Sequence, residues 1–143
     1  MASLLKMVGL CMAGLLLPAL ASAQQSGGAA SARETVTPQF RHALPNAPGL
    51  SLIAVTVDYP PGAKSAPHSH AKSAFIYGYV VSGAIRSQVD DEPAKVYRAG
   101  EAFFEMPGAH HKISENASNT EPARLLAVFV ADANETLTTP DPR

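Results

Sequence analysis

Short runs of β-branched, aromatic and aliphatic residues dominate the chain from residue 50 onward, and glycine or proline turns separate them. No stretch after residue 23 carries an apolar stripe of helical period between capping residues, which a stable helix would show. Short strands at close spacing with such turns are typical of an all-β sandwich or barrel. We expect strands at residues 50–59, 74–81, 84–89, 95–98, 102–106, 110–114 and 124–130.

The first 23 residues have the pattern of a secretory signal peptide. Lys6 precedes an apolar stretch over residues 7–20, and Ala21-Ser22-Ala23 supplies small residues for cleavage after Ala23. The apolar stretch is short for a membrane span. We therefore expect a Sec-exported protein, periplasmic or secreted, with no membrane anchor after cleavage. The remaining chain divides into a flexible leader and extended segment (24–49), a barrel domain (50–131) and a C-terminal tail (132–143).

Composition excludes several classes of function. The formal net charge is −1, and no run of lysine or arginine predicts nucleic acid or an anionic membrane as a partner. The one cysteine, Cys11, lies in the predicted signal peptide. The exported chain therefore has no disulfide, no thiolate metal ligand and no cysteine nucleophile. Any metal site must use nitrogen or oxygen ligands.

Four of the five histidines occur as two close pairs. His68 and His70 are two residues apart, so in a strand they share one face and can bind one metal ion together. His110 and His111 are adjacent and point to opposite faces, so at most one of them joins that site. His42 lies in a proline-rich segment, and we expect it at the surface.

The histidines belong to two longer patterns. Gly62 is followed by five residues, His68-Ser69-His70 and later Gly83. The run from Gly100 through Pro107-Gly108 to His111 forms the second pattern. Together they resemble the two motifs of the cupin family. The resemblance implies a single double-stranded β-helix, or jelly-roll barrel, with metal ligands at His68, His70 and His111 and with His110 facing outward.

The chain departs from the cupin motifs at the carboxylate ligand. The first motif normally supplies a glutamate after the histidine pair, yet no Asp or Glu occurs between Asp58 and Asp90. We therefore expect three neutral imidazoles without a carboxylate. Glu105 could act as a general base, but a solvated carboxylate at a strand end is the simpler interpretation. Three side chains are candidates for a weak fourth ligand or for a hydrogen bond to a bound ligand: Gln88, Tyr77 and Tyr79.

A divalent transition metal (Zn, Cu, Ni, Fe or Mn) bound by three histidines keeps an open coordination position. The resemblance to cupins then implies oxygenase or isomerase-like chemistry on a small molecule. The alternative is a non-catalytic periplasmic module that binds a small ligand or metal, and a third interpretation is a scaffold with an empty site. A homodimer paired through edge strands is compatible with each of these. The aromatic residues expected in the core or at an interface are Phe75, Tyr77, Tyr79, Phe103, Phe104 and Phe129.

Overall fold

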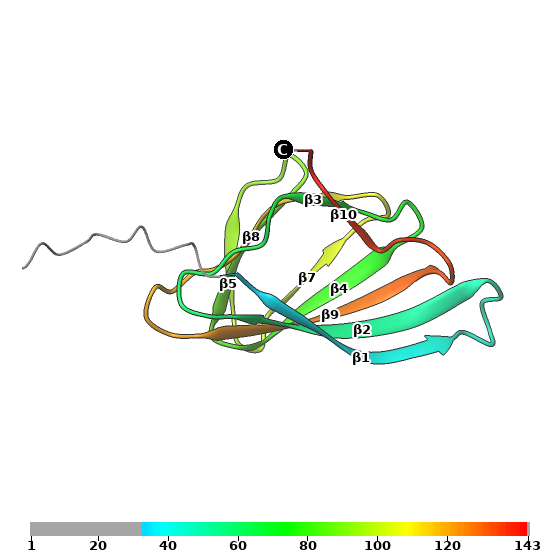
Figure 1. The fold of residues 1–143 in the computed structure, drawn as a ribbon, viewed down its shortest axis with the longest axis horizontal. Coiled ribbons are helices and arrows are strands. Elements are labelled where there is room, and N and C mark those ends of the chain that lie inside the picture. The colour runs from blue at the N-terminus through cyan, green and yellow to red at the C-terminus, as the bar shows by residue number, and fades with distance from the viewer. Residues whose placement is uncertain (1–32, 143) are drawn as a thin grey trace, which may run out of the picture.

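The computed structural model describes residues 33–142, which form two antiparallel sheets (Figure 1). The predicted signal peptide (1–23) and most of the predicted leader lie outside the described residues. The first sheet has the strand order β1-β2-β9-β4-β7 and the second has the order β10-β3-β8-β5-β6. The strands are β1 (Thr35–Ala43), β2 (Leu50–Tyr59), β3 (His68–His70), β4 (Phe75–Ser82), β5 (Ala84–Val89), β6 (Lys95–Arg98), β7 (Ala102–Glu105), β8 (His110–Asn116), β9 (Ala123–Asp132) and β10 (Thr138–Pro140).

The all-β jelly-roll fold predicted from the sequence is confirmed. The seven predicted strands correspond to β2 and β4–β9, and three of the seven, β2, β5 and β6, have the predicted bounds. None of the described residues forms a helix, so this part of the chain contains no helix that could cross a membrane. The inner faces of the two sheets oppose each other and enclose the core, as expected for a β-sandwich closed by short turns.

Alternation along β4 and β9 decides which side chains enter the core. In β4, Ile76, Gly78 and Val80 point inward, whereas Phe75 and Tyr77 are exposed. Phe103 and Phe129 are buried as expected. The other predicted core aromatics lie on the outer face of the first sheet, where Phe75 stacks on Phe104 and Tyr77 on Tyr79.

Gly78 makes room for the central aromatic of the core. It is the cross-strand partner of Phe103, and a Cβ added at Gly78 would lie 2.7 Å from the Phe103 ring. Gly83 has a φ of +71° in the turn between β4 and β5, and its Cβ would approach the carbonyl oxygen of Pro122 to 2.5 Å. Glycine at both positions therefore allows close packing that an L side chain would obstruct.

Two strands lie outside the predicted barrel range of 50–131. Strand β1 pairs along β2 over most of its length, within the predicted leader and extended segment (24–49). In the predicted tail, β10 pairs with β3 (Figure 1). In this pairing Thr138 faces His70 and Pro140 faces His68. Strand β10 is short, polar and exposed. Its own sequence therefore has no apolar alternation, and only its pairing partner defines it.

Candidate metal centre

The three predicted ligands converge at one point in the barrel. His68 and His70 lie on β3, and His111 lies on the neighbouring strand β8 as the cross-strand partner of His68. One ring nitrogen from each histidine lies within 4.8 Å of the other two. His70 and His111 are buried, and His68 is half-buried at the mouth. Three imidazoles arranged in this way could hold a metal ion.

A hydrogen bond on the far side of each imidazole fixes its orientation. Nδ1 of His68 lies 2.8 Å from the carbonyl oxygen of Ala66, and Nδ1 of His70 lies 3.2 Å from that of Leu137. Nε2 of His111 lies 2.8 Å from Oγ of Ser87. Nε2 of His68, Nε2 of His70 and Nδ1 of His111 are therefore left for a shared ligand. Such outer hydrogen bonds select the tautomer that leaves the inner nitrogen able to bind a metal.

A carboxylate lies beside the histidines, contrary to the expectation from the sequence. Glu105 is only 3% exposed, with Oε2 at 3.2 Å from Nε2 of His70 and Oε1 at 3.3 Å from Nδ1 of His111. The prediction of a solvated Glu105 is therefore wrong, and a carboxylate lies beside the three histidines that could hold a metal. Glu105 ends β7 as the cross-strand partner of Ile76 in β4, and both side chains point inward.

Residue alternation in β7 could have identified Glu105. Phe103 and Glu105 are two residues apart and share a face, so a buried Phe103 requires an inward Glu105. The expectation that both Phe103 and Phe104 lie in the core or at an interface hid this alternation. Phe104 instead points outward and is 62% exposed.

The electrostatics of the centre keep Glu105 charged and His68 neutral. Burial raises the pKa of Glu105, but the close approach of His111 and His70 outweighs that effect and lowers the pKa to about 2. Burial is also the main effect on His68 and lowers its pKa. A carboxylate beside three imidazoles is a suitable ligand set for a divalent transition metal.

Two atoms of the centre are buried without a hydrogen-bond partner. They are Nε2 of His70 and Oε2 of Glu105, which face each other at 3.2 Å in an orientation that makes no hydrogen bond. Unpartnered buried polar atoms are costly and uncommon in native proteins. A metal ion between these two atoms would satisfy both, so the residues present fit a metal.

The other sequence candidates lie away from the centre. His110 faces outward as predicted, and its Nε2 lies 2.9 Å from a carboxylate oxygen of Asp141. Tyr77 and Tyr79 stack on each other on the outer face of the first sheet. The amide of Gln88 donates to the backbone carbonyl of Glu92. None of these four side chains reaches the three histidines in the described structure, whereas the Glu105 carboxylate lies beside them.

The metal centre opens into a cavity of about 400 Å³ between the two sheets. Aliphatic side chains from β2, β4 and β9 line one part of its wall, and the C-terminal segment lines another through Leu137 and Thr138. Leu137 also supplies the carbonyl that orients His70. The predicted tail is therefore part of the site. The volume is in the range of small-molecule pockets.

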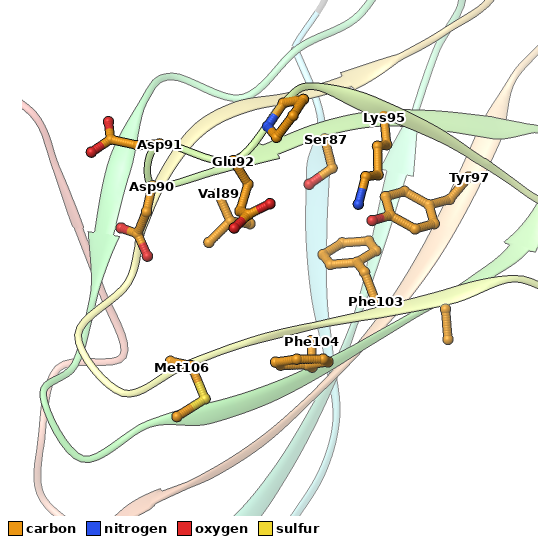
Figure 2. A pocket seen from close by; sticks show the side chains of 12 residues that line it. Ser87, Val89, Asp90, Asp91, Glu92, Lys95, Tyr97, Phe103, Phe104 and Met106 are labelled. Atoms are coloured by element: carbon orange, nitrogen blue, oxygen red, sulfur yellow. The ribbon is translucent and has the colours of Figure 1, made fainter.

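A second and larger pocket, of about 710 Å³, lies between β5, β6 and β7 (Figure 2). Figure 2 shows Asp90, Asp91 and Glu92 at one end, with Lys95 and Tyr97 at the other. Ser87 lines this pocket, and its hydroxyl contacts Nε2 of His111, whose Nδ1 faces Glu105 in the first cavity. Neither His68 nor His70 lines the second pocket. The cavity that contains the histidines is therefore the candidate site.

Comparison with known proteins is consistent with this architecture. The cupin domain family matches residues 55–129, which include all three histidines and Glu105. No curated protein matches the chain. Among solved structures, the protein TT1209 from Thermus thermophilus is 22% identical with a TM-score of 0.57, over 69% of this chain and 84% of its own. A double-stranded β-helix protein from Klebsiella pneumoniae is 18% identical with a TM-score of 0.61, over 80% and 89% of the two chains.

An oxalate oxidase solved in complex with glycolate is 25% identical with a TM-score of 0.54. The match covers 68% of this chain and 51% of the oxidase, so the chain spans about half the length of that enzyme. These likenesses support the fold. The chemistry must be argued from the residues of this chain.

Proposed function

The chain belongs to the cupin family, and we propose that it binds a divalent transition metal and presents the ion to a small molecule inside the barrel. His68, His70 and His111 supply the imidazole ligands. The metal is one of Zn, Cu, Ni, Fe or Mn, which all accept nitrogen and oxygen ligands. The affinity of such a site follows the general order that places Cu, Zn and Ni above Fe and Mn.

The buried pair of unpartnered atoms, Nε2 of His70 and Oε2 of Glu105, carries this proposal. A fold that only packed its core would bury apolar groups there, or would give both atoms partners. Here the neighbouring polar contacts point outward from the centre, through Ala66, Leu137 and Ser87. The centre itself is left for an ion. Glu105 would be its fourth ligand, in place of the glutamate that the first cupin motif normally supplies and that this chain lacks.

A bound ion would supply Lewis-acid chemistry, by polarising a ligand at its open position. The protein residues hold the imidazoles in place and exclude bulk water from Glu105. The hydroxyl groups of Tyr59, Ser65 and Ser114 line the same cavity and could orient a ligand. An enzyme built on this site would be of the oxygenase or isomerase type that the cupin resemblance implies.

A non-catalytic binding module is the second candidate function. The cavity lining includes no lysine, and its tyrosine hydroxyl already contacts two serines, so Glu34 is the one carboxylate beyond the metal centre among the described lining residues. Oxygen uptake and product analysis with a panel of phenols, thiols and diketones distinguish an enzyme from a binding module. Turnover that depends on His111 supports an enzyme, and binding without turnover supports the module.

Metal content tests the primary proposal. Protein purified without chelators should contain close to one equivalent of metal by elemental analysis, and His68→Ala and His111→Ala should each lose most of it. His110→Ala and His42→Ala are matched controls, because both are histidines away from the centre. Substoichiometric metal in the wild type, unchanged by the ligand substitutions, would contradict the proposal.

We also propose that the protein acts outside the cytoplasm, on the basis of the predicted signal peptide over residues 1–23. The ion would then be acquired after export in the unfolded state. Cell fractionation with N-terminal sequencing of the mature protein tests this: a chain that begins at Gln24 in the periplasmic or secreted fraction is expected. A cytoplasmic chain that retains Met1 would contradict export.

A further inference from the structure

The cavity beside the metal centre has one end formed by ionisable side chains, and the rest of its wall is more apolar than polar. The polar end is formed by the three histidines and Glu105. Aliphatic side chains from three strands line one side of the remaining wall: Val55, Val57, Ile76, Leu125 and Ala127. A ligand that reaches the ion from this cavity must therefore place the rest of its body against hydrocarbon.

The charges that line this cavity are negative. None of the described residues that line it is a lysine or an arginine. The carboxylates that line it are Glu34 and Glu105. A negatively charged group away from the ion would therefore have no cationic side chain to pair with, and burying an unpaired carboxylate costs several kcal/mol.

Three of the five hydroxyl groups that line the cavity are already hydrogen-bonded to one another, and that of Thr138 lies 3.4 Å from Nδ1 of His70. The hydroxyl of Tyr59 lies 2.9 Å from Oγ of Ser65 and 2.8 Å from Oγ of Ser114. A second polar group on the ligand would share these hydroxyl groups with the existing network, and all of them are neutral. The wall therefore does not offer a second polar subsite comparable to the metal centre.

We propose that the cavity accepts a small molecule with a single metal-binding head group and an apolar, uncharged body. This inference rests on the proposed function, because the head group is assigned to the ion. It disfavours dicarboxylates and phosphorylated compounds, in which a second anionic group would face the aliphatic wall. Simple phenols, monocarboxylates and thiols with hydrocarbon bodies have the required chemistry.

Two probes that differ only at the end remote from the head group test this proposal. 4-Methylbenzoate and terephthalate carry the same carboxylate head, but a methyl group in one replaces the second carboxylate of the other. Isothermal titration calorimetry on the zinc-loaded protein should show 4-methylbenzoate binding about 100-fold more tightly, because only terephthalate buries an unpaired charge. Equal or tighter binding of terephthalate would overturn the inference.

A cation introduced at the rim supplies an independent test. Thr136 is exposed and lines the cavity, so Thr136→Lys should fold normally and place an ammonium group within reach of a remote carboxylate. We expect Thr136→Lys to reduce the preference for 4-methylbenzoate over terephthalate by about tenfold or more. Thr136→Gln introduces an uncharged side chain of similar size to lysine and should retain this preference. An unchanged preference in Thr136→Lys would contradict the role of missing cations.

Metal analysis of the same samples distinguishes failure of the proposed metal site from failure of the proposed ligand class. A wild-type protein that retains no zinc would refute the proposed function, together with the assignment of the head group. A zinc-loaded protein that does not discriminate between the two probes would refute the ligand class and leave the metal site intact.

Discussion

Moving the buried carboxylate from β7 to β4 would show whether Glu105 replaces the glutamate missing from the first cupin motif. Ile76 and Glu105 are directly opposite each other in the antiparallel pair, and both are almost fully buried. Opposite side chains on one face have Cβ atoms about 5 Å apart. A glutamate at position 76 should therefore reach the same centre from the neighbouring strand.

The single substitution Glu105→Ile removes the carboxylate and keeps a side chain of similar volume. Changes in groups that only support metal ligands cost about 10- to 100-fold in affinity. We therefore expect loss of a ligand to cost at least about 100-fold in zinc affinity, equivalent to about 2.7 kcal/mol. The double variant Ile76→Glu/Glu105→Ile should recover at least about tenfold of this loss, because it restores the carboxylate on the same face.

Competition titration against a chromophoric zinc chelator measures these affinities, and circular dichroism with thermal melting verifies that each variant is folded. Glu115→Gln is a control, because Glu115 pairs with Arg86 away from the histidines. Wild-type zinc affinity in a folded Glu105→Ile variant would refute the assignment of Glu105 as a ligand. A double variant no better than the single one would refute the cross-strand argument.

Three further predictions concern residues that support the site and the fold. Ser87→Ala should weaken zinc binding by about 10- to 100-fold, measured in the same competition assay, because the imidazole of His111 loses the hydroxyl that orients it. Burial raises the pKa of Tyr59, so its proton is held more tightly in the folded state. The resulting stability is complete below about pH 10 and is lost as the pH rises through the raised pKa. Urea denaturation between pH 7 and 11 should therefore show a steeper alkaline loss for the wild type than for Tyr59→Phe, and parallel curves would contradict this. Asn116→Asp should destabilise the fold more than Asn116→Ala, as measured by thermal denaturation. The side-chain nitrogen of Asn116 donates toward three backbone carbonyl oxygens, and in Asn116→Asp a carboxylate oxygen would face them. A greater loss of stability in Asn116→Ala would contradict the role of this network.

Local sequence pattern was sufficient for most of the fold. Alternation and turn residues placed seven strands, and β2 (Leu50–Tyr59) matches its predicted bounds. The two-residue spacing of His68 and His70 put both on one face, and the same rule allowed at most one of His110 and His111 into the site. The resemblance to the second cupin motif selected His111. These conclusions depend on residues that are close in sequence, which is why they could be made without a structure.

The tertiary structure decided which strands lie opposite each other, and this determined the chemistry of the site. Glu105 reaches the histidines because β7 pairs with β4 at Ile76, a contact between residues 29 apart in the chain. The C-terminal strand β10 became part of the site because it pairs with β3 and places the carbonyl of Leu137 beside His70. Strand register is set by packing across the whole barrel, so no local pattern encodes it. The sequence alone therefore determined the fold and three histidines, whereas the structure revealed the carboxylate and the apolar cavity that complete the site.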